Sequence, residues 1–260
     1  MPPDYAVPAL EKALDILEVL ADRPALSQLE VAQAVDRSPS QIFRVLATLE
    51  RRGYLYRDAQ SGAYSLSLRL FDLAHRQEPL RSLTDAALGP MRDLAAATGQ
   101  SCNLSVLESG GVRVVAQVES PADFGYRVRV GALFPLDATA TGAVLSAFGG
   151  ASAIGPVDLV FGPAVEAEDD EASGDGGIWD GGGFDGAMLH RIRDEGYMER
   201  PDPLQPSVTD VVYPVLNRDR TALAALTVPY VATSYSGMPA ERVRQLTAAA
   251  VARISTSLGL

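Results

Sequence analysis

The sequence predicts an α+β chain of two domains. Two observations indicate this fold class: helix patterns and one hairpin pattern fill residues 8–66, and strand patterns mixed with helix patterns follow them. At 260 residues the chain is also longer than most single domains. We place a first domain at 1–78, a linker helix at 79–98 and a second domain at 99–260.

The first two helices are marked by apolar spacing and by capping residues. The second begins at Ser27, where Glu30 three positions later completes a capping box, and continues through Val35. The first follows Pro8 and ends near Asp22. Its apolar residues at helical spacing are Leu10, Ala13, Leu14, Leu17, Leu20 and Ala21.

The third helix has the clearest start of the three. Ser38 is the cap, Pro39 suits the first turn and Gln41 is the capping-box partner. Gly53 ends it, and residues 54–57 and 63–66 form a hairpin around a polar turn at 58–62. A short second helix, a tight connector, a capped third helix and a hairpin are typical of a winged helix-turn-helix. The residues expected to seat the third helix on the other two are Ile42, Val45, Leu46 and Leu49.

The polar side of the third helix suits the major groove of DNA, where arginine and glutamine make paired hydrogen bonds to base edges. The chain has a net charge of −11, but residues 37–57 hold five arginines and one acid, and phosphate attraction acts locally. A helical module with a merely solvated polar face is the alternative. The residues predicted to contact DNA are Arg37, Ser38, Ser40, Gln41, Arg44, Thr48, Arg51 and Arg57.

One recognition helix reads only a few base pairs, so a homodimer on a palindromic operator is expected. Whether dimers pair into tetramers stays open. No apolar run is long enough for a membrane span, and residues 1–4 lack the features of a secretory signal. We therefore expect a cytoplasmic protein with no membrane partner.

An enzyme is the rival class of protein. Neither histidine, His75 or His190, lies in a nucleophile, metal or dinucleotide motif. The single cysteine, Cys102, alternates with Leu104 and Val106, which is typical of a small buried hydrophobic residue. No catalytic residue, cofactor or metal site is predicted.

The second domain begins with a helix that Gly89 and Pro90 should bend or interrupt. Alternation then predicts a half-buried hairpin of 101–107 and 112–118. Further strands are expected at 126–130, 211–216 and 222–228, and a last helix at 239–258. Residues 162–186 are rich in glycine and acids and are interpreted as a flexible loop or lid. Their carboxylates lack the regular spacing of a calcium site.

The chain resembles the IclR family of bacterial transcriptional regulators. Residues 9–17 resemble the opening helix of that family, and residues 40–54 resemble its recognition helix. Residues 129–131, 135–142 and 192–197 resemble its effector domain. Two positions depart from the pattern, since the family usually has histidine at Asp137 and lysine at Ala143.

The resemblance implies a winged helix-turn-helix joined by a linker helix to a GAF-like effector-binding domain. It also implies a ligand-responsive regulator of a catabolic operon. The alternatives are an enzyme, or a metabolite-binding protein of the same fold without affinity for DNA. The effector-binding residues that the resemblance implies are Thr139, Ala140, Thr141, Arg200, Asp210, Thr227 and Pro229.

These residues favour a small organic acid, such as a sugar acid or an oxo acid. A helix start near Thr139 attracts anions, Arg200 can hold a carboxylate through two hydrogen bonds, and Asp210 can accept from hydroxyls. Purely structural roles stay open at this point. Arg200 would then pair with Asp202, Asp210 would cap a strand end, and Thr227 would only pack.

Overall fold

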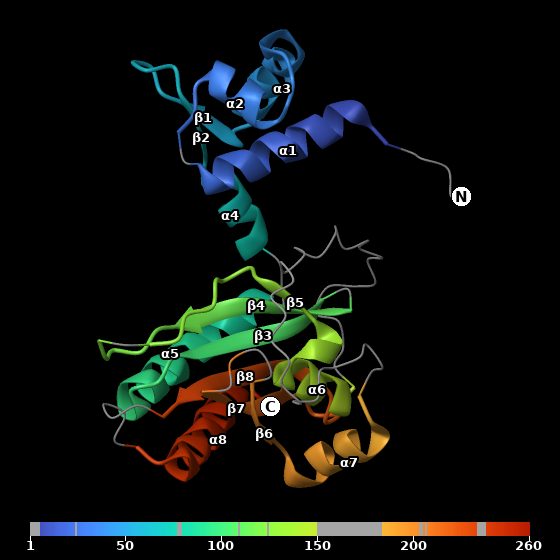
Figure 1. Cartoon of the computed structure of the whole chain (residues 1–260), viewed down its shortest axis with the longest axis vertical. Helices are drawn as coiled ribbons and strands as arrows, with labels where there is room; N and C mark the ends of the chain where they lie inside the picture. The colour runs from blue at the N-terminus through green and yellow to red at the C-terminus, as the bar shows by residue number, and fades with distance from the viewer. Residues whose placement is uncertain are drawn as a thin grey trace, which may run out of the picture. The chain divides into compact units, whose positions relative to one another are not determined.

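The computed structural model describes residues 6–260 except 24, 77–79, 109, 124, 150–183, 203–204, 206 and 233–237. The chain divides into two compact units, Met1–Glu78 and Pro79–Leu260. Figure 1 shows the elements of both units. The predicted α+β fold class is confirmed. In the described part of the chain no helix is long and apolar enough to cross a membrane.

The first unit contains the predicted helices and hairpin. Its elements are α1 (Pro8–Asp22), α2 (Gln28–Ala34), α3 (Pro39–Arg51), β1 (Leu55–Arg57), β2 (Tyr64–Leu66) and α4 (Arg69–His75). The capping box of α2 forms as expected. The amide of Ser27 donates to Glu30 at 2.7 Å, and the amide of Glu30 donates to the Ser27 hydroxyl.

The core of the first unit lies where α1 and α3 cross β1 and β2. The apolar stripe predicted for α1 is partly wrong, because Leu10 and Leu14 are exposed whereas Ile16 is fully buried. The residues that seat α3 are correctly identified: Ile42, Leu46 and Leu49 are buried, and the half-buried Val45 packs against the same core. The buried hydrophobic residues are Ile16, Leu20, Val31, Ala32, Ile42, Leu46, Leu49, Leu55 and Tyr64.

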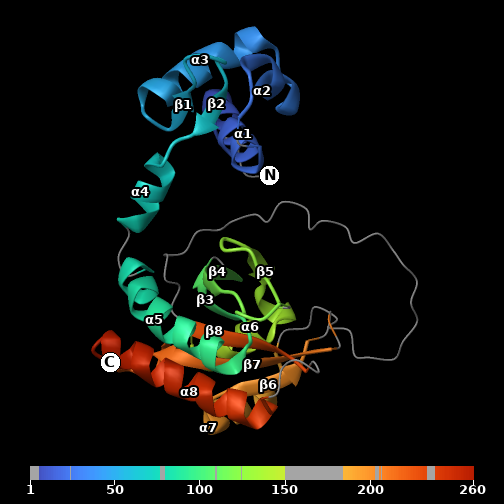
Figure 2. The same cartoon turned by 90° about the vertical axis from the view of Figure 1, so that its left-hand side faces the viewer.

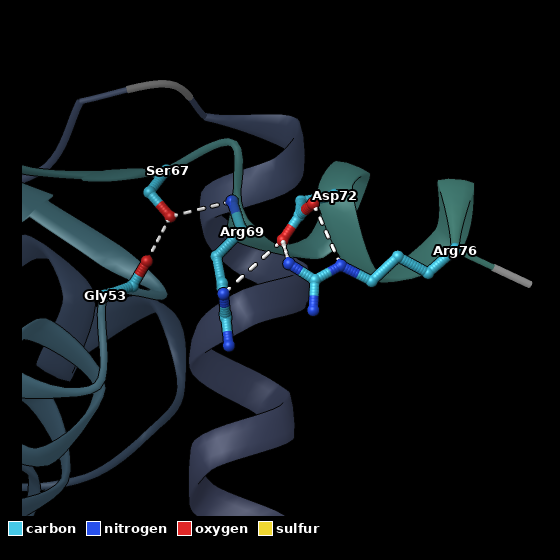
Figure 3. Close-up of polar contacts among 5 residues, drawn as sticks. All are labelled: Gly53, Ser67, Arg69, Asp72 and Arg76. Carbon is cyan, nitrogen blue, oxygen red and sulfur yellow. Dashed lines mark hydrogen bonds and ion pairs between the residues drawn. The ribbon is translucent and has the colours of Figure 1, made fainter.

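Polar contacts join the end of α3 to α4, a helix that the sequence did not predict (Figure 3). The Ser67 hydroxyl donates to the Gly53 carbonyl and accepts from the Arg69 amide at 3.1 Å. Within α4, Asp72 forms ion pairs with Arg69 and with Arg76, at 3.4 and 2.8 Å. These contacts fix the chain where it leaves the hairpin.

The second unit is built on a six-stranded antiparallel sheet in the order β5-β4-β3-β8-β7-β6. The central strands β3, β8 and β7 bring together segments more than 100 residues apart in sequence. The strands are β3 (Cys102–Glu108), β4 (Gly111–Val118), β5 (Leu133–Pro135), β6 (Met198–Pro201), β7 (Val208–Leu216) and β8 (Ala222–Val231).

Helices cover both faces of this sheet (Figure 2). On one face lie α5 (Leu80–Thr98) and α8 (Ala240–Ser257). On the other lie the short 3-10 helix η1 (Leu136–Ala138), α6 (Ala140–Ala147) and α7 (Gly186–Glu195). The expectation of a half-buried hairpin is therefore wrong. Because α6 covers the polar side of β3, Ser101, Asn103 and Ser105 are buried as well.

One further expectation for this unit is narrowed, and another is wrong. Of the two outcomes expected at Gly89 and Pro90, an interruption does not occur: α5 continues through Pro90, and its buried face packs on the sheet and offsets the lost backbone hydrogen bond. Residues 126–130 do not form a strand. Gly131, at φ +88°, turns the chain so that pairing with β4 starts only afterwards.

Cys102 is fully buried, as predicted, and its thiol donates to the Met91 carbonyl at 3.5 Å. Burial raises the pKa of this thiol to about 12, so it stays protonated at neutral pH. The glycine- and acid-rich stretch at 162–186 lies outside the described residues apart from its last three positions.

Candidate functional site

The outer surface of α3 carries the polar residues predicted from the sequence. Ile42 and Leu46 are fully buried against the other helices, which fixes the orientation of the helix. The residues on the exposed side of α3 and next to it are Arg37, Ser38, Ser40, Gln41, Arg44, Thr48, Arg51 and Arg57, and every one of these side chains is exposed.

Two of these side chains also hold the helix together. The amide of Ser38 donates to Gln41 Oε1 at 3.0 Å, and the Thr48 hydroxyl donates to the Arg44 carbonyl at 2.7 Å. Gln41 Oε1 thus already accepts one hydrogen bond within the cap, and its second lone pair and its N–H groups remain for a base. Arg44 is exposed beside it.

Arg57 is held by the hairpin itself. Its Nε donates to the Gly62 carbonyl at 3.4 Å, and its guanidinium carbon lies 5.3 Å from the centre of the Tyr64 ring. At the tip of the turn, Asp58 accepts hydrogen bonds from the amides of Gln60 and Ser61. The wing therefore presents a positive charge at a fixed place beside α3.

A second polar site lies on the face of the sheet covered by α6. Arg200 on β6 pairs across the strands with Asp210 on β7, which pairs with Pro229 on β8. The hydroxyls of Thr141 and Thr227 lie 2.8 Å apart and join the first turn of α6 to β8. The structure thus brings most of the predicted effector residues to one face, and Thr227 does more than pack.

The start of α6 is less open than predicted. The Thr139 hydroxyl accepts from the Gly142 amide at 2.9 Å, so this amide is not free for an anion. Ala140 is buried in the core between α6 and the sheet. The Ala143 amide donates to the Thr139 carbonyl, so two amides of this turn are already engaged.

The charges at this site are close to balanced. The pKa of Asp210 is raised to about 7, mainly by burial and also by the carboxylate of Asp202, while Arg200 lowers it in part. Burial likewise lowers the pKa of Arg200, whereas the carboxylates of Asp210 and Asp202 raise it in part. One arginine and two ionised aspartates give a local charge of −1, and protonation of Asp210 brings it to zero. An anion placed beside these groups would therefore meet less repulsion when Asp210 is protonated.

The sequence analysis missed several polar residues of this site. Asn103 pairs across the sheet with both Thr227 and Gln117, so the three share one face. The Gln117 amide donates to the Tyr126 carbonyl at 3.5 Å, and its buried Oε1 has no hydrogen-bond partner among the described residues. The alternation of Asn103 and Ser105 along β3 was the available signal.

A cavity of about 410 Å³ lies at the other end of α6. Its lining residues are Ala147, Phe148, Gly149, Arg193 and Arg220, and none of them is a predicted effector residue. This cavity is therefore separate from the polar side chains that meet on the sheet.

Comparisons with known proteins identify a family for each of the two units. Residues 9–59 match the IclR helix-turn-helix domain, and residues 80–157 match the bacterial transcriptional regulator IclR C-terminal domain. The regulator KdgR of Escherichia coli is 24% identical over 98% of this chain and 94% of its own. The glycerol operon regulatory protein of Streptomyces coelicolor is 29% identical over 85% of this chain and 83% of its own.

Solved structures show the same fold. An IclR homologue from Microbacterium hydrocarbonoxydans, complexed with 4-hydroxybenzoate, is 22% identical and covers 96% of this chain and 99% of its own, with a TM-score of 0.71. HmgR of Pseudomonas aeruginosa is 25% identical, covers 96% of this chain and 98% of its own, and has a TM-score of 0.65.

The helix-turn-helix and its matches place the chain among DNA-binding transcriptional regulators that respond to ligands. The chain belongs to the IclR family. It is accordingly a regulator and not an enzyme.

Proposed function

We propose that this regulator binds the operator of a catabolic operon as a homodimer in the cytoplasm and is controlled by a small organic acid. The supporting observation is the outer surface of α3, where Arg44 is exposed above a buried row of Ile42, Leu46 and Leu49. Ser38, Ser40, Gln41, Arg44 and Thr48 face the bases in this proposal. Arg37, Arg51 and Arg57 contact the phosphates.

Replacing Arg44 with alanine is expected to weaken specific DNA binding roughly ten- to one-hundred-fold, because a paired contact to a guanine is lost. Arg44→Lys keeps the charge but not the two-pronged geometry, so it should keep non-specific binding and lose preference for the operator. The measurement is fluorescence anisotropy on a duplex that the wild-type protein enriches from a random library.

Arg76→Ala is the matched control, because Arg76 is exposed on α4 in an ion pair with Asp72. It should bind the selected duplex like the wild type. Wild-type affinity in the Arg44→Ala variant would contradict the proposed role of α3. If the wild type enriches no duplex at all, the alternative of a metabolite-binding protein without DNA affinity is favoured instead.

The effector is proposed to place its carboxylate near Arg200 and its hydroxyl or oxo oxygen near the Thr139–Thr141 turn and Thr227. Asp210 contributes a proton or accepts from a hydroxyl, according to pH, while Ala140 and Pro229 form apolar walls. The paired strands β6, β7 and β8 support this arrangement, because they carry Arg200, Asp210 and Thr227 on one face. The helix at 79–98 is proposed to link the two functions.

The acid is expected to raise the melting temperature of the full chain in proportion to the logarithm of its concentration. Pyruvate, gluconate and 4-hydroxybenzoate are suitable probes, with glycerol as the neutral comparison. Arg200→Gln should abolish the shift. If glycerol alone stabilises the protein, or if Arg200→Gln responds like the wild type, the acid-binding proposal is wrong.

A further inference from the structure

A large aromatic side chain lies on the exposed side of α3. Phe43 is 55% exposed, whereas its neighbour Ile42 is fully buried in the core. Phe43 is not among the core residues that seat α3 on the other helices. An exposed ring forgoes the stability that its burial would provide. This position suggests a role in contact with a partner.

Phe43 belongs to an apolar strip along one edge of the outer surface of α3. Ala47 lies one turn further on and is also exposed. Arg44 and Thr48, each one position later than these two, lie about 100° further round the helix. The outer surface of α3 thus has a polar edge and an apolar edge, side by side.

The charge around the strip identifies the partner. Residues 37–57 hold five arginines and one acid, so the surface complements a polyanion and not an apolar protein surface. In the major groove of DNA the apolar group on the base edges is the C5 methyl of thymine, which alanine and phenylalanine contact. We propose that Phe43 and Ala47 recognise thymine methyl groups in the operator, next to the bases that Arg44 reads. This inference depends on the proposed role of α3 in DNA binding.

The test removes single methyl groups from the DNA. In the duplex that the wild type enriches from a random library, each thymine is replaced in turn by uracil, which lacks only the methyl. At one or two thymines per half-site, uracil should weaken wild-type binding roughly three- to ten-fold. In Phe43→Ala, at least one of these uracil effects should vanish, because the contacting ring is gone. The cycle of protein and DNA changes isolates the pairwise contact.

Two variants control for other effects. Phe43→Leu keeps an apolar side chain and should keep part of the uracil sensitivity. Tyr56→Ala removes an exposed aromatic residue of the wing and should keep all of it. Phe43 is exposed and alanine favours helices, so Phe43→Ala should fold normally, which circular dichroism verifies.

The remaining outcomes overturn the inference, and they distinguish a failure of DNA binding from a failure of methyl recognition. If no duplex is enriched, the proposed DNA binding itself fails. If a duplex is enriched but no uracil weakens binding, or if Phe43→Ala retains every uracil effect, DNA binding stands and methyl recognition by Phe43 is wrong.

Discussion

The Gly142→Ala variant is expected to lose more than about 3 kcal/mol of stability in the second unit, although alanine normally favours helices. A methyl group at Gly142 would lie 1.8 Å from the carbonyl oxygen of Leu136 and 2.8 Å from its carbonyl carbon. Both are backbone atoms, so no side chain can move aside. Either η1 or the first turn of α6 must shift, and the Thr139 cap on the Gly142 amide would break.

Thermal unfolding followed by far-ultraviolet circular dichroism measures this loss. Gly186→Ala is the matched control, because Gly186 lies in the first turn of α7 and a methyl group there meets no atom within 4 Å beyond its chain neighbours and its own helix. That variant should be at least as stable as the wild type, by up to about 1 kcal/mol. A Gly142→Ala protein that melts at the wild-type temperature would contradict the close approach of η1 and α6.

The Asp210→Asn variant should remove a pH dependence of stability that the wild type shows. The pKa of Asp210 is raised to about 7 by burial, whereas an unfolded aspartate has a pKa near 3.9. Below about pH 4 the folded and the unfolded states both carry this proton, and the contribution of the raised pKa to the free energy of unfolding is fully present. As the pH rises toward 7 only the unfolded state releases the proton, so the contribution declines, and above 7 the loss is complete.

Asparagine stays neutral throughout, so the stability of Asp210→Asn relative to wild type should rise between about pH 4 and 7. The expected gain is on the order of 4 kcal/mol at most. Urea unfolding at a series of pH values provides the measurement. Asp219→Asn, at an exposed aspartate in the turn between β7 and β8, should follow the wild type. Parallel curves for wild type and Asp210→Asn would show that Asp210 ionises normally.

The structure matches the sequence analysis most closely where the signals are local. The start of α3 at Pro39 follows from Ser38 and Gln41 alone, since a cap and its partner are three residues apart. The exposure of Arg44 follows from helical spacing, once Ile42, Leu46 and Leu49 are assigned to the buried side of the helix. The exposure of Leu10 and Leu14 was missed, because α1 carries more apolar residues than its buried side needs.

The second site could be predicted only in part, because contacts across the sheet assemble it. Asn103 lies beside Thr227, 124 positions away, and nothing near either residue encodes that strand pairing. The burial of Ser105 depends on α6, which a strand pattern cannot anticipate. Resemblance to the family supplied Arg200 and Asp210 but not Gln117, whose importance emerges from its unpaired buried oxygen.

The bond between Thr141 and Thr227 also has a consequence for ligand selection. A ligand that binds between these two residues must break the hydrogen bond between their hydroxyls. It gains binding free energy there only if its own oxygens form hydrogen bonds with both hydroxyls. A hydrocarbon of the same shape would leave the Thr141 and Thr227 hydroxyls buried without a hydrogen-bond partner. Each unpaired hydroxyl would cost roughly 1–3 kcal/mol of binding free energy. In the proposed effector site, this pair of hydroxyls would therefore disfavour apolar analogues of a polar effector.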